Sequence, residues 1–175
     1  MTLARALTSA ADQAAIRVYA AGKVCLVEVG VAWGDTSRIL RESMAADGVL
    51  HLVDPFLPTE VPGQRLTADI NLARESVGLV PRGTVVWHVH TSEDAARGFT
   101  DAPDFVFIDG LHDRESVLLD WSLWSPLVRP GGAVLLHDVG PYCPGAWSAW
   151  QSIQHTPGWE CMGVRGAVGI MARRP

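Results

Sequence analysis

The chain has 175 residues, enough for a single domain that buries roughly two-thirds of the surface of its unfolded chain. Its net charge is −5 and its 14 Lys and Arg residues are scattered, which argues against nucleic acid as a partner. We find no apolar run that could span a bilayer and no signal peptide, and the three cysteines lack CxxC spacing. We therefore expect a cytoplasmic protein with reduced thiols that does not act at a membrane.

Segments typical of helices and strands alternate along the chain. Helices are predicted over 2–21, 36–46, 64–79 and 113–128, with a short helix that begins at 91–93 and another short stretch carrying Trp147 and Trp150. Strands are predicted over 24–29, 49–53, 84–89, 104–108 and 133–136, followed by a hairpin of 159–164 and 168–172. The proline-rich segment 56–63 is predicted to be a loop. This order predicts one α/β domain, 1–175, with an N-terminal helix (1–22) before a Rossmann-like core (23–175). The core is a doubly wound, mostly parallel seven-stranded sheet that ends in an antiparallel hairpin.

Three predicted strands each end in polar or glycine-rich residues. The strand 104–108 is followed by Asp109, Gly110 and His112, and the strand 133–136 by the pair His137-Asp138. The first strand, 24–29, runs into a glycine loop. Ligands of open parallel sheets bind at the carboxyl ends of the strands, so this edge is the predicted active site.

The glycine loop EVGVAWGDTS leads from a strand into a helix. Gly30 allows a tight turn, and Gly34 lets a ligand approach the backbone near the helix amides. The spacing is not the G-x-G-x-x-G that binds a dinucleotide pyrophosphate. Glu28, just before the loop, favours a ligand with a cationic amino-acid moiety, and Asp54 ends the next strand where a carboxylate can accept hydrogen bonds from a ribose diol. The alternative is that both glycines only form turns and Asp54 is a loop acid.

These features resemble a known enzyme family. The motif E-x-G-x-x-x-G, with Asp54 as the ribose-binding acid, is similar to class I S-adenosylmethionine-dependent methyltransferases. The run FIDGLHDRESVLLDWSLWSPLVRPGGAVLLHD resembles the metal-dependent O-methyltransferases of the macrolide-sugar (macrocin and mycinamicin) type. The similarity covers residues 23–140 well. It implies an S-adenosylmethionine site made by Glu28, Gly30, Gly34, Asp54 and Asp109, with Ser92 and Glu93 near the adenine.

The ends of the two later strands suggest a metal centre. Asp109 and Asp138 end adjacent parallel strands, so their carboxylates can converge on one cation, and hard oxygen ligands favour Mg²⁺. The resemblance implies that both are ligands and that His112 is the catalytic general base. His137 stands where these enzymes usually carry a second acid, and it is either a ligand or a supporting residue. As a ligand it would favour Mn²⁺, Fe²⁺ or Zn²⁺. Val139 cannot be a ligand, although catechol-type relatives place an asparagine there.

Three functions follow from these patterns. The first is metal-assisted O-methylation of a hydroxyl group on a small natural product or sugar. The second is a metal-dependent hydroxylase on the same fold, and the third is a non-catalytic cofactor-binding partner subunit. Trp147 and Trp150 are candidates for the acceptor site or for the interface of a homodimer.

Overall fold

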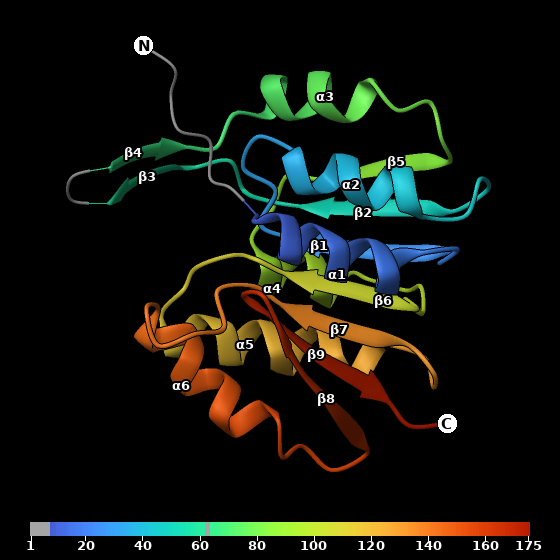
Figure 1. Cartoon of the computed structure of the whole chain (residues 1–175). Helices are drawn as coiled ribbons and strands as arrows, with labels where there is room; N and C mark the ends of the chain where they lie inside the picture. The colour runs from blue at the N-terminus through green and yellow to red at the C-terminus, as the bar shows by residue number, and fades with distance from the viewer. Residues whose placement is uncertain (1–7, 62–63) are drawn as a thin grey trace.

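The structure is a computed structural model that describes residues 8–61 and 64–175. Its centre is a seven-stranded sheet in the order β5-β2-β1-β6-β7-β9-β8 (Figure 1). The strands are β1 (Cys25–Val29), β2 (Val49–Val53), β5 (Thr84–His88), β6 (Phe105–Ile108), β7 (Ala133–Leu136), β8 (Trp159–Arg165) and β9 (Val168–Arg173). The first five are mutually parallel, and the β8–β9 hairpin is joined to β7 by the antiparallel strand β9. This confirms the predicted fold class.

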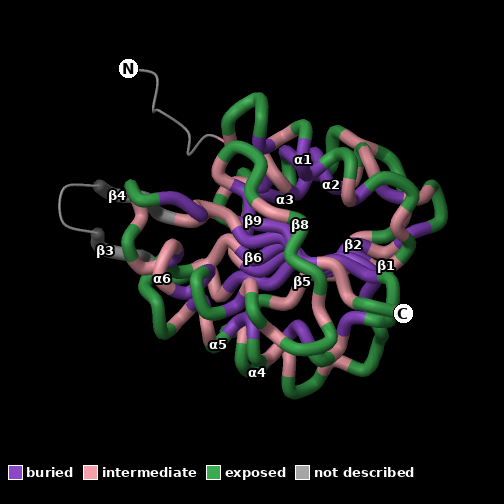
Figure 2. The backbone as a smooth tube through the Cα atoms, turned by 60° about the horizontal axis from the view of Figure 1, so that its bottom comes forward, coloured by how far each residue is buried: buried purple, intermediate pink, exposed green. Residues whose placement is uncertain are grey.

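Helices cover both faces of the sheet. They are α1 (Ala10–Ala20), α2 (Asp35–Ser43), α3 (Ile70–Gly78), α4 (Ser92–Arg97), α5 (Arg114–Trp124), η1 (Ser125–Leu127) and α6 (Pro144–Ile153). One core lies between the sheet and α1, α2 and α3, and the other between the sheet and α4, α5 and α6. The central strands are therefore buried on both sides (Figure 2), as expected for parallel strands rich in Val, Leu and Phe. No helix among the described residues combines the length and apolar character needed to cross a bilayer.

Two local predictions are wrong. The predicted loop 56–63 and the start of the predicted helix 64–79 instead contain β3 (Pro58–Val61) and β4 (Gln64–Thr67), which pair as a separate antiparallel sheet. At the other end, residues 8 and 9 are not helical, because the Ser9 hydroxyl caps α1 by accepting from the Asp12 amide. Residues 2–7 of that predicted helix, and 62–63 of the loop, lie outside the described residues.

Candidate functional site

The glycine loop follows β1 and is shaped by close backbone contacts. Gly30 has φ +88°, and a Cβ at this position would collide with the Asp109 carbonyl at the end of β6. Gly34 has φ +77° and stands at the start of α2, where a Cβ would lie 2.9 Å from the Ala73 carbonyl oxygen. Only glycine meets both demands, so the loop lies directly against the end of β6.

Glu28 on β1 is a buried acid with an unused oxygen. Its Oε2 accepts a hydrogen bond from Ser37, whereas Oε1 has no hydrogen-bond partner. Burial, and then the charges of Asp109 and Asp54, raise the pKa of Glu28 well above its usual range, although the Ser37 bond opposes them. A buried carboxylate oxygen in this state is stabilised by a cationic or hydrogen-bond-donating ligand.

A small hollow of about 60 Å³ lies beside Glu28. It is lined by Glu28, Gly30, Val31, Ala32, Trp33, Asp35, Thr36 and Asp109. The loop thus encloses a space with acids from two neighbouring strands, β1 and β6. That the amino-acid part of a ligand binds here stays a prediction.

Asp54, at the end of β2, makes hydrogen bonds that sequence reasoning did not foresee. Its Oδ2 accepts from the amides of Val31 (2.9 Å) and Ala32 (3.1 Å), and Oδ1 accepts from the Phe56 amide. In this conformation the carboxylate holds the glycine loop in place. The ribose contact of Asp54 stays a prediction, and it requires the carboxylate to share or exchange these amide bonds.

Ser92 and Glu93 begin α4, next to the end of β5. The Ser92 hydroxyl accepts a hydrogen bond from the Trp124 indole at 2.9 Å, which joins α4 to α5. Glu93 is exposed and pairs with Arg97 one turn later. Their predicted contact with adenine is untested, but the hydroxyl of Ser92 already has a structural role.

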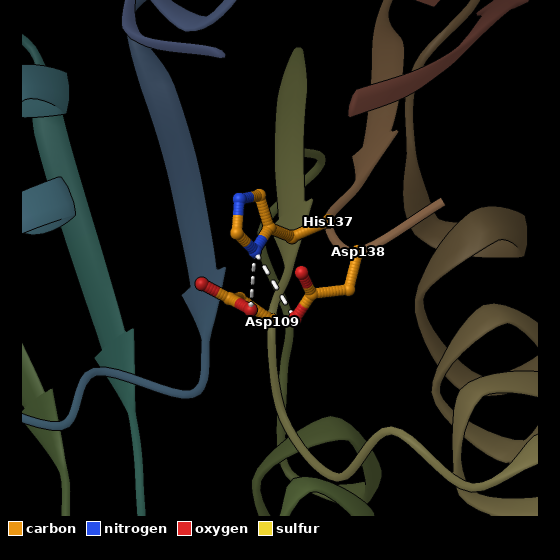
Figure 3. Close-up of side chains that lie close together, drawn as sticks. All are labelled: Asp109, His137 and Asp138. Atoms are coloured by element: carbon orange, nitrogen blue, oxygen red, sulfur yellow. Dashed lines mark hydrogen bonds and ion pairs between the residues drawn. The ribbon is translucent and has the colours of Figure 1, made fainter. Parts of the chain in front are cut away.

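The predicted metal ligands lie together. Asp109 follows β6, and His137 and Asp138 follow β7, with one potential ligand atom of each within 4.8 Å of the others (Figure 3). Nδ1 of His137 is 3.1 Å from Asp109 and 3.6 Å from Asp138. Burial opposes a charge on this ring, but hydrogen bonds to the two carboxylates outweigh it and raise the pKa of His137 to about 10. One nitrogen and two carboxylates facing a common point fit a divalent cation.

His112 lies beside the same two acids. Its Nδ1 is 3.2 Å from Asp138 and its Nε2 is 3.5 Å from Asp109, and its side chain is 46% exposed. The Asp109 carboxylate raises the pKa of His112 despite partial burial. The predicted base is therefore half open to solvent and next to the cluster, where it can meet a bound acceptor.

Two further residues reach this cluster that the sequence did not single out. Tyr142, in the loop after β7, donates its hydroxyl to Asp138 at 3.1 Å. Asp12 on α1 is 2% exposed, and its Oδ2 lies 3.8 Å from Nε2 of His137. An acid in an N-terminal helix carries no motif, so only the folded arrangement brings it to the site.

Backbone strain gathers at the same edge of the sheet. Within the described parts of the chain, the non-glycine residues with positive φ are Ala32, Phe56 and Asp138. They follow the ends of β1, β2 and β7. Such conformations are uncommon for residues with a Cβ and cluster at ligand-binding sites, so the backbone independently points to this edge.

Comparison with known families agrees with this geometry. Residues 27–139, more than half of the chain, match a family model described as a methyltransferase domain. This chain belongs to that methyltransferase family. The matched range starts within β1 and ends just after Asp138, so it contains the glycine loop, Asp54 and the acid–histidine cluster.

Solved structures resemble the fold of this chain over nearly its whole length. Cofactor-bound Rv0187 from MTB has a TM-score of 0.74 at 18% identity, covering 97% of this chain and 83% of that one. The O-methyltransferase TomG from Streptomyces achromogenes, in complex with SAM, has a TM-score of 0.74 at 16% identity, with 97% and 82% coverage. An O-methyltransferase from Bacillus cereus in complex with SAH has a TM-score of 0.68 at 17% identity, with 99% and 84% coverage.

Proposed function

We propose that this chain transfers the methyl group of S-adenosylmethionine to a hydroxyl group of a small natural product or sugar, with a divalent cation held by Asp109, His137 and Asp138. The observation that carries the proposal is that Asp109 belongs to two sites at once. It lines the hollow beside Glu28 and is also a member of the acid–histidine cluster. A cofactor in the hollow and an acceptor at the cluster would therefore be neighbours.

The hollow suits the methionine end of the cofactor. The free Oε1 of Glu28 can accept from an ammonium group, and the glycine loop leaves room for a chain beside it. Relatives of similar fold that bind SAM or SAH support this choice of cofactor.

The cluster suits the acceptor end. When bound, a divalent cation supplies Lewis-acid activation of the acceptor hydroxyl. In the transfer, the bond from sulfur to the methyl carbon breaks as a bond from that carbon to the acceptor oxygen forms, and the hydroxyl proton passes to His112. The cofactor leaves as S-adenosylhomocysteine. The protein mainly holds both reactants in line, which Asp109 favours by its place between them.

The donor set argues against the hydroxylase alternative. Non-haem iron oxygenases typically use two histidines and one carboxylate, whereas Asp109, His137 and Asp138 provide one histidine and two carboxylates. A non-catalytic partner subunit would need neither the half-exposed His112 nor the three converging ligands.

The test combines binding and transfer. Calorimetry with S-adenosylmethionine, with and without Mg²⁺ or Mn²⁺, measures cofactor binding, and transfer of labelled methyl to a panel of catechols and sugars is followed with and without a chelator. We expect micromolar-range binding and transfer that the chelator abolishes. Asp113→Ala, which removes an exposed cap of α5 outside the donor set, is the matched control for chelator sensitivity. No cofactor binding would contradict the methyltransferase proposal, whereas chelator-resistant transfer would contradict only its metal part.

A further inference from the structure

The imidazole of His137 bridges two sets of acids. Its Nδ1 faces Asp109 and Asp138, while the opposite ring nitrogen, Nε2, points away from them (Figure 3). Nε2 is buried and has no hydrogen-bond partner. The acid nearest to it in an ion pair is Asp12, with Oδ2 at 3.8 Å.

Asp12 is held firmly at this place. Its Oδ1 accepts a hydrogen bond from the amide of Ala167, in the turn between β8 and β9. Its Oδ2 accepts from the Ser9 amide at 2.7 Å, and the Ser9 hydroxyl bonds back to the Asp12 amide. The helix cap and the β8–β9 turn thus fix the carboxylate, and one further lone pair on Oδ2 is left for a donor.

Ligation of a cation through Nδ1 requires the proton of a neutral imidazole to be on Nε2. An Nε2–H there lacks an acceptor unless Asp12 and the ring close their 3.8 Å separation to a hydrogen bond of roughly 3 Å. Metal-bound histidines commonly donate their other N–H to a carboxylate in this way, which sets the tautomer and the ring orientation.

We propose that Asp12 is a positioning residue for the metal centre: its carboxylate accepts the Nε2–H of His137, so that the Nδ1 lone pair faces the cation between Asp109 and Asp138. This inference rests on the proposed function, because it presumes the cation. The role of Asp12 also affects which metal is preferred. A nitrogen ligand whose lone pair is turned toward the cation favours Mn²⁺ or Zn²⁺ over Mg²⁺, whereas a site made of carboxylates alone favours Mg²⁺.

The first test measures metal affinity, independent of turnover. Metal-free protein is titrated with Mn²⁺, and free Mn²⁺ is followed by electron paramagnetic resonance. Asp12→Asn keeps the shape and one acceptor oxygen but loses the charge, and we expect its Mn²⁺ affinity to fall about 10- to 100-fold. Asp104→Asn is the matched control, since it makes the same change at a buried acid that lies before β6, at the opposite end of the sheet. Its Mn²⁺ affinity should equal that of the parent.

The second test uses the unmodified protein, in case Asp12→Asn does not fold. Long-range ¹H–¹⁵N spectra of ¹⁵N-histidine-labelled protein report the tautomer of each ring, and His137→Gln identifies the signal. With Zn²⁺ we expect His137 to carry its proton on Nε2 and to bind the metal through Nδ1. A proton on Nδ1, or a folded Asp12→Asn variant with parental Mn²⁺ affinity, overturns the inference about Asp12 alone.

A parallel titration with S-adenosylmethionine separates this inference from the broader proposal. If no divalent cation binds but the cofactor does, the metal centre and the role of Asp12 both fail while the methyltransferase assignment stands. If neither binds, the proposed function fails as well.

Discussion

The unpaired oxygen of Glu28 leads to the most discriminating prediction. Glu28→Gln keeps the size of the side chain and an oxygen to accept from Ser37, but replaces the carboxylate oxygen that faces the hollow with an amide. The hydrogen bond lost to the cofactor's ammonium group is charge-assisted and contributes about 1.5–3 kcal/mol. At about 1.4 kcal/mol for each tenfold change, S-adenosylmethionine should bind about 10- to 100-fold more weakly.

The same substitution should not weaken the ligand-free fold. Burial of an incompletely paired carboxylate is costly, as the raised pKa of Glu28 indicates, and a neutral amide is less so. We expect the melting temperature of the free variant at mildly alkaline pH to rise, by about 2–4 °C for each kcal/mol gained. Weaker binding with a more stable free protein is a combination that a purely structural acid cannot produce.

Asp104→Asn is the matched control for Glu28→Gln. Asp104 is also a buried acid, but it lies before β6, at the opposite end of the sheet. Both of its carboxylate oxygens have hydrogen-bond partners. It accepts from the amides of Val24 and Cys25 at 3.0 Å and pairs with Arg129 at 2.7 Å. This variant should lose stability and keep its cofactor affinity. Titration calorimetry measures the cofactor affinity of both variants, and scanning calorimetry measures their stability. Parental affinity in Glu28→Gln, or a large loss of its stability, would contradict a cofactor-binding role for Glu28.

Three further predictions test the acid–histidine cluster and the core between the sheet and α4, α5 and α6. His112→Ala should lower kcat about 10²- to 10⁴-fold with the fold intact, as expected for a general base. Asp138→Ala should abolish chelator-sensitive transfer, with S-adenosylmethionine affinity by calorimetry within a few-fold of the parent. Burial raises the pKa of Asp120 on α5 to about 6, so the folded protein binds a proton that the unfolded chain releases near 3.8. Stability should therefore fall by about 3 kcal/mol as pH rises from about 4 to about 6, and Asp120→Asn should remove this slope in urea titrations.

Each of these three predictions would be contradicted by a different result. Normal turnover by His112→Ala would assign the proton to His137 or solvent. Transfer that persists in Asp138→Ala would exclude a catalytic cation, and equal pH slopes for parent and Asp120→Asn would show that folding does not shift the pKa of Asp120.

The sheet and the polar ends of its strands could be predicted because local sequence suffices for them. The run 105–108 is apolar throughout, and the run 25–29 is apolar except for Glu28, which is the pattern of strands covered on both faces. Their ends are marked by glycine or by acid–glycine pairs. Once the strands are parallel, the residues that follow them share one edge, so the meeting of Asp109 with Asp138 followed from topology.

The hairpin β3–β4 was not predictable in the same way. Its segment carries two prolines before residue 64 and helix-forming residues after it, so local preferences indicate a loop and a helix. The two strands pair only with each other, away from the main sheet. Pairing of this kind depends on neighbours rather than on an apolar period, and propensity rules do not detect it.

Side-chain partners were harder still. Asp12 meets the amide of Ala167, 155 residues later in the chain, and that separation leaves no trace in any short motif. Asp54 was predicted from its place at a strand end, but its bonds to Val31 and Ala32 depend on the exact path of the glycine loop. Sequence reasoning located the acids, whereas only the fold determines which donors they meet.

The tight contact between Gly30 and Asp109 explains why these parts act as one site. Because Gly30 has no Cβ, the loop after β1 rests on the carbonyl of Asp109, and the Asp109 side chain then faces both the hollow and the cluster. Asp54 holds the far side of the same loop. A shift of the loop on cofactor binding would therefore move Asp109, which is one of the three proposed ligands of a cation. The proposed cofactor and cation sites would thus be coupled through this one backbone contact.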